Sequence, residues 1–186
     1  MVRPRPALTL SGMSAYRVRP ATREDCPAIL AIYNEAVLTT TATYDLEPRT
    51  LEHRQAWFDA HARGGYAVLV AETAAGEVAG WSSLNPHHDR WGYRFTAENS
   101  VYVAAAHRGR GVGSLLLAPL IEAARTRGLH VILAGVDATN TASLRLHEKS
   151  GFVPVGRFRE VGRKFGRWLD VVYLQRTLPL DLPPED

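Results

Sequence analysis

The sequence predicts an α/β fold in which helices cover a mixed β-sheet, and three observations lead to this prediction. Segments with apolar residues at every second position alternate along the chain with segments of helical period. A glycine-rich loop at 109–113 joins an apolar strand to a long helix. Residues 130–136 form a continuous apolar run, which is typical of a strand covered on both faces.

The first half of the chain is expected to contain a strand, two helices and a strand pair. Thr22 and Thr50 are residues of the type that caps helix N-termini. Gly64 and Gly65 form a helix stop signal, and Gly76 marks a turn between two apolar segments. The expected elements are strand 16–20, a helix from residue 22, helix 50–62, and strands 66–71 and 78–84.

The second half is expected to repeat the strand-helix order and to close with a hairpin. The long helix has one apolar face and ends before Gly128, and Pro119 inside it predicts a local bend. The last two strands alternate apolar and polar residues on either side of a turn at 162–166. The expected elements are strand 100–105, helix 112–127, strand 130–136, helix 142–149, and strands 152–160 and 167–176.

Length and composition favour one globular domain. The chain has 186 residues, of which 46% are hydrophobic and 22% are charged, as in ordinary soluble proteins. Residues 1–13 contain two Arg-Pro pairs, and residues 179–186 are acidic and proline-rich. We therefore expect a flexible leader at 1–13, a single domain at 14–178 and a flexible tail at 179–186.

Charge and cysteine content exclude several classes of protein. Cys26 is the lone cysteine, so there is no disulfide framework, and a reducing, cytoplasmic location is expected. The net charge of +3 is too small to indicate nucleic acid, and no apolar run approaches the roughly 20 residues that span a bilayer. His87, His88 and Asp89 are adjacent but lack a third ligand at a suitable spacing, so no metal is expected.

The strongest single feature is the glycine-rich loop at the start of the long helix. Helix N-termini present unpaired N–H groups and the positive end of the helix dipole, so they bind phosphate oxygens. Glycines let the backbone approach those oxygens, and the two arginines of the loop add positive charge. The expected ligand is a cofactor that carries a diphosphate. The residues concerned are Arg108, Gly109, Arg110, Gly111, Val112, Gly113 and Ser114.

Three kinds of phosphate site use such a loop, and the loop alone does not distinguish among them. A Walker A loop needs a lysine before Ser or Thr, which this loop lacks. A dinucleotide loop, G-x-G-x-x-G, would have Leu116 in its third glycine position, although Asp137 does end the next strand as that fold requires. A pantetheine-diphosphate loop, R-x-x-G-x-G, fits through Arg108, Gly111 and Gly113. A glycine-rich helix start without a ligand is the remaining interpretation.

Further motifs follow the loop in a defined order. After it come a second strand and an Asn-containing helix that ends in Gly-Phe. Matching segments also occur at 32–37, at Tyr44 with Glu47-Pro48, at 93–103, at 146–148 and at 161–170. Together they resemble the GCN5-related N-acetyltransferase superfamily, in particular its phosphinothricin and methionine sulfoximine acetyltransferase branch. The resemblance covers about residues 17–177 and implies a mixed, mostly antiparallel central sheet flanked by helices.

The resemblance implies catalytic and cofactor-binding residues. Glu98 matches the general base of the branch, which is needed because an ammonium group must lose a proton before it attacks a carbonyl. His147 matches the second catalytic position, where it would take the proton or position the base. The alternatives are a solvated glutamate at a strand end and a histidine that interacts with a helix C-terminus. The pantetheine arm of acetyl-CoA would contact Val101, Tyr102, Val103, Asn140 and Ser143.

Substrate and partner follow from the same resemblance. The branch often has an R-x-R-x-x-Tyr pattern suited to a small anionic amino acid. Arg90 and Tyr93 keep this pattern, His88 replaces its first arginine, and Arg94 is a further candidate for holding a carboxylate or phosphinate. The implied acceptor is a small amino acid or an analogue of the phosphinothricin, methionine sulfoximine or methionine sulfone type. The C-terminal hairpin region often contributes to dimers in this branch, so a homodimer is expected.

These observations predict an N-acetyltransferase in which the amine attacks acetyl-CoA directly in a ternary complex. Cys26 has no activating neighbours in the sequence, so no acyl-enzyme is expected. One alternative is a non-catalytic acyl-CoA-binding module, which would need neither Glu98 nor His147. Another is a nucleotide-dependent oxidoreductase, which Leu116 and the helix pair before the first strand pair disfavour.

Overall fold

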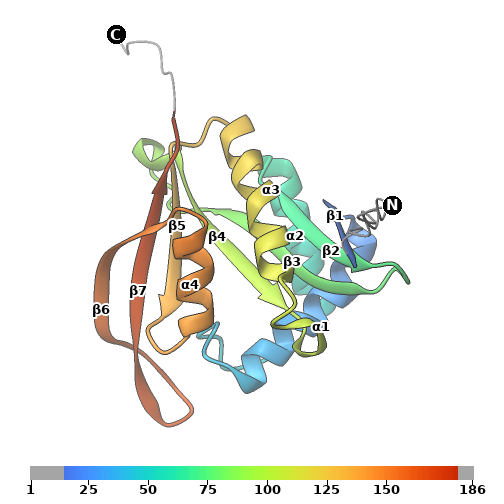
Figure 1. Ribbon diagram of the computed structural model, residues 1–186, viewed down its shortest axis with the longest axis horizontal. Helices are drawn as coiled ribbons and strands as arrows, with labels where there is room; N and C mark the ends of the chain where they lie inside the picture. The colour runs from blue at the N-terminus through green and yellow to red at the C-terminus, as the bar shows by residue number, and fades with distance from the viewer. Residues whose placement is uncertain (1–14, 180–186) are drawn as a thin grey trace, which may run out of the picture.

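The computed structural model describes residues 15–179, which form a seven-stranded sheet with four α-helices (Figure 1). The expected leader, residues 1–13, and all but the first residue of the expected tail lie outside these residues. The α-helices and strands are β1 (Tyr16–Pro20), α1 (Cys26–Thr39), α2 (Leu51–Gly64), β2 (Val68–Thr73), β3 (Val78–Pro86), β4 (Thr96–Val103), α3 (Val112–Thr126), β5 (Val131–Asp137), α4 (Thr141–Lys149), β6 (Val153–Lys164) and β7 (Arg167–Thr177). Short 3-10 helices precede α1, β4 and α3 at Arg23–Asp25, Trp91–Tyr93 and Ala105–His107.

The sheet is mixed and mostly antiparallel, which confirms the expected fold. Its strand order is β1-β2-β3-β4-β5-β7-β6, and β4–β5 is the parallel pair. Figure 1 shows α3 and α4 on one face and α1 and α2 on the other. On the first face, α3 packs Leu116, Leu117 and Leu120 into the larger core cluster. On the second face, Ile29 of α1 and Trp81 of β3 belong to a smaller cluster.

Local signals in the sequence set several element boundaries. The Thr50 hydroxyl accepts a hydrogen bond from the backbone N–H of His53 at 3.2 Å and so caps α2. Gly65 ends the same helix in the left-handed region, with φ of 66°. Gly111 precedes α3 with φ of 82°, a conformation that favours glycine. These boundaries agree with the sequence prediction.

The structure differs from the prediction at three elements that bear on the site, in extent at β4 and β6 and in burial at β5. β4 begins at Thr96 instead of residue 100, so Glu98 lies within a strand and does not precede it. β6 runs on to Lys164 through an irregularity between Phe158 and Gly162. β5 is fully covered only on the face of α3 and α4, because Ile132, Ala134 and Val136 are buried while its opposite face is half-buried at residues 131 and 133.

The parallel pair β4–β5 separates after three residues. Thr96, Ala97 and Glu98 pair with residues 131–133, whereas the rest of β4 pairs only with β3 and the rest of β5 only with β7. At the point of separation the Asn99 side chain donates to the carbonyl oxygen of Leu133 at 3.0 Å. The sheet therefore opens between the two strands, beyond Asn99.

Candidate active site

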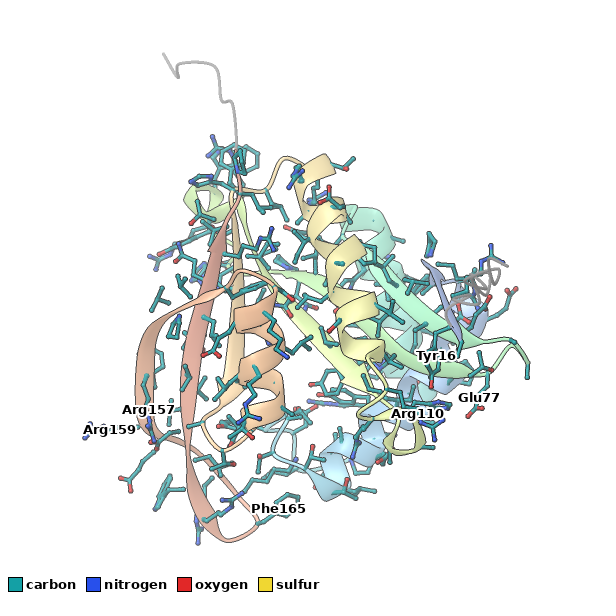
Figure 2. The ribbon with its side chains drawn as sticks, in the orientation of Figure 1. Tyr16, Glu77, Arg110, Arg157, Arg159 and Phe165 are labelled. Carbon is teal, nitrogen blue, oxygen red and sulfur yellow. The ribbon has the colours of Figure 1, made fainter. Side chains whose placement is uncertain are left out.

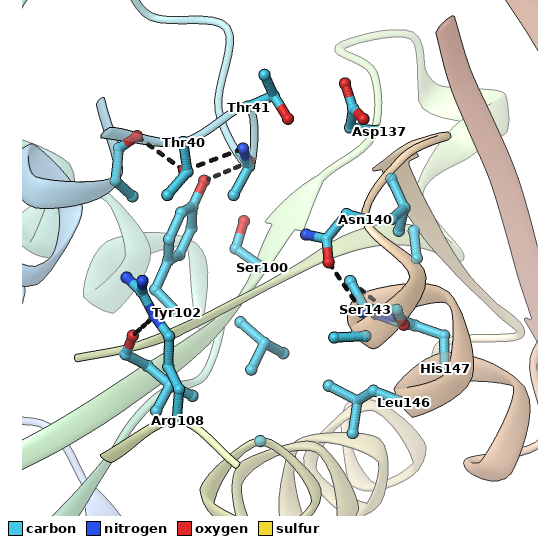
Figure 3. A pocket seen from close by; sticks show the side chains of 18 of the residues that line it. Thr40, Thr41, Ser100, Tyr102, Arg108, Asp137, Asn140, Ser143, Leu146 and His147 are labelled. Atoms are coloured by element: carbon cyan, nitrogen blue, oxygen red, sulfur yellow. Dashed lines mark hydrogen bonds between the residues drawn. The ribbon is translucent and has the colours of Figure 1, made fainter. Parts of the chain in front are cut away.

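A cavity of about 750 Å³ occupies the opening between β4 and β5. Its lining comes from α1 and the loop after it, from β4 and β5, from the glycine-rich loop, from α4 and from the tip of the β6–β7 hairpin. Figure 3 shows Thr40, Thr41 and Tyr102 along one wall and Asn140, Ser143 and His147 along the other. Because helices cover both faces of the sheet and residues from both faces line the cavity, it connects the two faces.

The glycine-rich loop forms one end of the cavity and fits the expected phosphate site. Gly109 and Gly111 both have positive φ, and a Cβ at either position would meet no atom within 4 Å. Gly113 has another role, since a Cβ there would lie 3.1 Å from Leu146 Cδ2 of α4, so it allows close packing. The exposed backbone N–H groups at the start of α3 can receive phosphate oxygens.

The two arginines of the loop differ in their placement. Arg108 lines the cavity, where it donates to Glu35 Oε1 and to the carbonyl oxygen of Val103, each at 3.0 Å. Arg110 is exposed and is not among the residues that line the cavity. Val112 and Ser114 line it at the start of the helix. The charge expected from Arg108 is thus partly balanced by Glu35.

The two long walls contain the residues expected to contact pantetheine. Val101, Tyr102 and Val103 line the cavity where β4 has no partner strand on that side, so backbone groups of β4 are open to a ligand. Asn140 also lines it and caps α4, because its Oδ1 accepts from the backbone N–H of Ser143 at 3.1 Å. The cap uses the oxygen of this amide and leaves its NH2 group available as a donor.

Glu98 lies on the face of the sheet that is opposite to α3 and α4. Its neighbours Ala97 and Asn99 contact the α3 and α4 side, and successive side chains on a strand alternate between faces. Burial raises the pKa of the half-buried Glu98 carboxyl, and the charge of His87 partly opposes this. Glu98 is not itself among the lining residues, but a Cβ on the lining residue Gly135 would lie 3.3 Å from Glu98 Oε1.

His147 reaches the cavity from the other face. It is 4% exposed, and its Nε2 lies 3.0 Å from Asn99 Oδ1. The Asn99 amide nitrogen donates to Leu133, so its oxygen faces the ring, and His147 Nδ1 lies 2.8 Å from the carbonyl oxygen of Ser143. Both ring nitrogens therefore face acceptors, and only the protonated imidazole can donate to both. Burial lowers the pKa of the His147 imidazole. The histidine thus holds Asn99, the residue that follows Glu98, and does not contact Glu98 itself.

The residues expected to bind substrate lie outside this cavity. Arg90, Tyr93 and Arg94 belong to the connection between β3 and β4. The guanidinium of Arg94 stacks over Trp91 and over Phe95, 5.0 and 4.3 Å from their ring centres. Tyr93 packs edge-on against His87, with ring centres 5.5 Å apart, and the charge of His87 acts on Glu98. This connection is therefore close to Glu98 although it does not line the cavity.

Several cavity residues were not predicted from the sequence. They include Thr39 at the end of α1, Thr40, Thr41 and Ala42 after it, Gly135 and Asp137 on β5, and Phe165 and Arg167 at the hairpin tip. Figure 2 shows Phe165 at the turn of the hairpin, far along the chain from the loop after α1. No local spacing links these segments, so the sequence offered no signal except Asp137 at a strand end.

The residues that the structure describes contain neither a metal-binding cluster nor a membrane-spanning helix. Within residues 15–179 no group of three or more His, Cys, Asp or Glu side chains is placed to hold a metal ion. In the same range no helix has the length and apolar character required to cross a bilayer.

The model of the acetyltransferase (GNAT) family matches residues 29–152, and the chain belongs to this family and is an acetyltransferase. A curated relative from Pseudomonas paraeruginosa, an L-methionine sulfoximine/L-methionine sulfone acetyltransferase, is 50% identical over 87% of this chain and 94% of its own. A phosphinothricin N-acetyltransferase from Streptomyces coelicolor is 41% identical over 91% of this chain and 100% of its own.

A solved structure gives the same result at the level of the fold. An acetyltransferase from Salmonella typhimurium, solved with its cofactor acetyl-CoA, superposes with a TM-score of 0.88 at 42% identity. The match covers 91% of this chain and 98% of that chain. The similarity therefore extends through the domain, beyond the segment that the family model matches.

Proposed function

We propose that this acetyltransferase transfers the acetyl group of acetyl-CoA to the primary amine of a small amino acid or analogue, of the methionine sulfoximine, methionine sulfone or phosphinothricin type. The observation that carries the proposal is the cavity through the sheet opening. It joins the phosphate-binding end of α3, on one face, to the face on which Glu98 lies. Acetyl-CoA can therefore place its thioester in the opening from one face of the sheet, and the amine can approach that thioester from the other face.

The donor side is assigned to the loop and to the open half of β4. The residues between Arg108 and Ser114 that line the cavity would hold the diphosphate, with Arg110 beside them at the surface, and Asn140 and Ser143 would contact the pantetheine arm. A backbone N–H among Val101, Tyr102 and Val103 would donate to the thioester oxygen as negative charge develops on it. No metal is required for this chemistry.

Glu98 is proposed as the general base, acting directly or through water. Its carboxylate would take the proton of the acceptor's ammonium group, and the neutral amine would then attack the thioester carbon. The carbon–sulfur bond breaks, the coenzyme leaves as its thiolate, and the thiolate takes up the second proton that the nitrogen loses as the amide forms. The raised pKa of Glu98 suits this role, because a base nearer neutrality binds the amine proton better.

His147 is proposed as the second member of the catalytic pair and acts by positioning. Its hydrogen bond to Asn99 fixes the residue next to Glu98 at the point where β4 and β5 separate. We propose that the acceptor contacts Arg90, Tyr93 and Arg94. Tyr93 packs on His87, and the charge of His87 acts on Glu98, so this connection is near the proposed base. Cys26 is fully buried in α1 and takes no part.

We further propose that the protein forms a homodimer through β6 and β7 in the cytoplasm. β6 is an edge strand, and Val155, Phe158 and Val161 on it are each more than half exposed. Trp168 on β7 is equally exposed. A row of exposed apolar side chains on a sheet edge is typical of an interface. The free thiol of Cys26 agrees with a reducing compartment.

A screen of amines tests the proposed reaction. Acetyl-CoA is mixed with the protein and with methionine sulfone, methionine sulfoximine or phosphinothricin, and free thiol is measured. We expect thiol release with these amino acids and little with a peptide N-terminus. Stabilisation against heat by acetyl-CoA but not by NAD would exclude the oxidoreductase. Acetyl-CoA binding without thiol release for any amine would instead support the non-catalytic module and contradict the proposal.

A further inference from the structure

Asp137, at the end of β5, is a buried carboxylate with one oxygen that lacks a partner. Its exposed fraction is 5%. Oδ1 accepts from the backbone N–H of Thr139 at 2.8 Å and from the Thr139 hydroxyl. Oδ2 has no hydrogen-bond partner among residues 15–179. A buried carboxylate oxygen without a donor is costly, so a ligand of the cavity is expected to supply one.

The side chain of Asp137 lines the cavity on the same face as Glu98. Gly135 is two residues earlier on the strand, and a Cβ there would point at Glu98 Oε1. Side chains two residues apart on a strand share a face, so Asp137 points to that side as well. Figure 3 shows Asp137 across the cavity from Thr41, in the loop after α1. Because Gly135 has no side chain, no side chain of β5 separates the carboxylates of Glu98 and Asp137.

The spacing places the two carboxylates at different depths of one cleft. Glu98 pairs with Leu133, which is four residues from Asp137 on β5. The Glu98 side chain reaches along β5 as far as Gly135, two residues from Asp137, and at about 3.3 Å per residue this leaves about 7 Å, too far for one amine to contact both groups at once. Glu98 lies where β4 and β5 still pair, whereas Asp137 lies where they are apart. Asp137 therefore marks the open end of the cleft.

Charge decides which of the two substrates Asp137 suits. Acetyl-CoA is anionic at its phosphates, and its amide N–H groups are neutral. The acceptor of the proposed reaction carries an ammonium group at neutral pH, which an ionised carboxylate attracts. We propose that Asp137 is a substrate-specificity residue, which binds the acceptor's ammonium group as it enters the cleft, before Glu98 takes its proton. This inference rests on the proposed function.

The charged and polar neighbours of Asp137 suit such a site and provide a control. Burial, the charges of Asp137 and Asp170, and an interaction of its hydroxyl with the Asp137 carboxylate raise the pKa of Tyr44 to about 12, so the hydroxyl stays neutral. It lies near Asp137 but forms no well-aligned hydrogen bond to Oδ2. The Tyr44 hydroxyl donates to the carbonyl oxygen of Asp170 at 3.5 Å. Arg167, at the hairpin tip, also lines the cavity and could hold the acceptor's carboxylate. Substitution of Tyr44 tests whether the effect of Asp137 on the acceptor depends on the Tyr44 hydroxyl.

The substitution Asp137→Asn tests the inference, because it keeps the Oδ1 acceptor for Thr139 and removes the charge. We expect KM for methionine sulfone to rise about tenfold or more, the usual loss for a charge-assisted hydrogen bond. The Kd for acetyl-CoA, measured by calorimetry, should change less than about twofold. The desamino analogue of methionine sulfone, used as a competitive inhibitor, should lose no affinity. Thr139→Val is the control for the turn, and Tyr44→Phe is the control for the neighbouring hydroxyl.

Each other outcome overturns the assignment. Equal losses for methionine sulfone and its desamino analogue would show a structural role. A selective loss of acetyl-CoA affinity would assign Asp137 to the pantetheine arm. An unchanged KM in Asp137→Asn, or the same increase in Tyr44→Phe, would remove the direct contact with the amine. If the wild-type protein releases no thiol with any amine, the proposed function itself has failed, so the two failures are distinguishable.

Discussion

Glu98 is a residue at which the requirements of catalysis and of stability oppose each other. Burial raises the pKa of its carboxyl, so the folded protein binds this proton more tightly than the unfolded chain does. Ionisation of Glu98 therefore lowers the free energy of unfolding. This loss develops as pH rises from the usual pKa of a glutamate to the raised pKa of Glu98. Above that window the cost is fully present, and below it the cost vanishes.

The variant Glu98→Gln is accordingly expected to be more stable than the wild type at neutral pH. The gain should be at most about 1 kcal/mol, because the carboxyl is half-exposed and solvent screens it. At about pH 3.5 both side chains are neutral and the difference should disappear. Thermal unfolding at the two pH values measures this. A wild type that is more stable than the variant at neutral pH would show a stabilising partner for Glu98.

Gly111 tests the phosphate-binding end of the cavity. Its φ is positive and a Cβ would project into open space, so a side chain costs backbone strain and also occupies the path of the diphosphate. Gly111→Val is expected to weaken acetyl-CoA binding by about tenfold or more, as measured by calorimetry.

Gly76 is the matched control for Gly111. It has φ of 83°, and a Cβ there also meets nothing within 4 Å, but it lies in the turn between β2 and β3. Gly76→Val should therefore carry the same strain of about 1 kcal/mol and leave acetyl-CoA affinity unchanged. Equal affinities in both variants would mean that the loop does not hold the coenzyme.

At the scale of elements, the loop after α1 is held against the β6–β7 hairpin. Lys164 is buried and donates to the carbonyl oxygen of Thr43 at 2.8 Å. The Tyr44 ring packs directly on Gly162, at the irregular part of β6. Glu160 adopts φ of 50° beside it, and its backbone N–H donates to Asp170 Oδ1. This contact brings the hairpin tip and the loop to the same side of the cavity.

Gly162→Ala is expected to disturb this contact. A Cβ at Gly162 would overlap the Tyr44 ring, and relief by movement of the loop should cost about 1–3 kcal/mol. Urea unfolding gives the change in stability. Gly156→Ala, on the same strand but with no atom within 4 Å of a Cβ, should be close to neutral. If the two variants lose equal stability, the packing of Tyr44 on Gly162 is not what matters.

The extents of most elements followed from local signals, whereas β4 shows the limit of such reasoning. β1 and the caps of α2 follow from short-range chemistry, so the sequence was sufficient for them. The start of β4 was missed because Thr96, Glu98 and Asn99 are polar and are typical of a loop. They form a strand because Ala97 is buried in the core and because Ala97 and Glu98 pair with both β3 and β5.

The sequence predicted the parts of the candidate site that lie in one continuous segment. It did not predict the parts where segments distant in the sequence meet. The loop from Arg108 to Ser114 is contiguous, so its glycine spacing was informative. That β4 and β5 separate after three residues depends on tertiary structure, and no local pattern encodes it. For the same reason the sequence could not show that Asp137 and Phe165 line the cavity, or that Arg110 does not.

At the scale of the whole molecule, the exposed edge of the sheet is the surface through which we propose that the protein forms a dimer. Figure 2 shows Arg157 and Arg159 at the outer edge of the hairpin, and Arg157 pairs with Asp170. The apolar residues between these charges remain exposed in the single chain. A second copy that packs on β6 would cover them.

Val155→Lys is expected to shift the protein from dimer to monomer, because the charge would be buried without a partner. Sedimentation velocity at micromolar concentration measures the shift. Leu38→Lys is the control, since Leu38 is 59% exposed near the end of α1. A wild type that sediments as a monomer would contradict the proposed dimer.

Transfer across the sheet opening is the central claim, and the kinetics of Glu98→Gln test it most directly. Steady-state thiol release with methionine sulfone gives kcat, and calorimetry gives the Kd for acetyl-CoA. The account predicts that kcat falls by about 10²–10⁴-fold, the usual contribution of a general base, while the Kd changes less than about twofold. A variant with wild-type kcat, or one whose loss is fully explained by weaker acetyl-CoA binding, would contradict it.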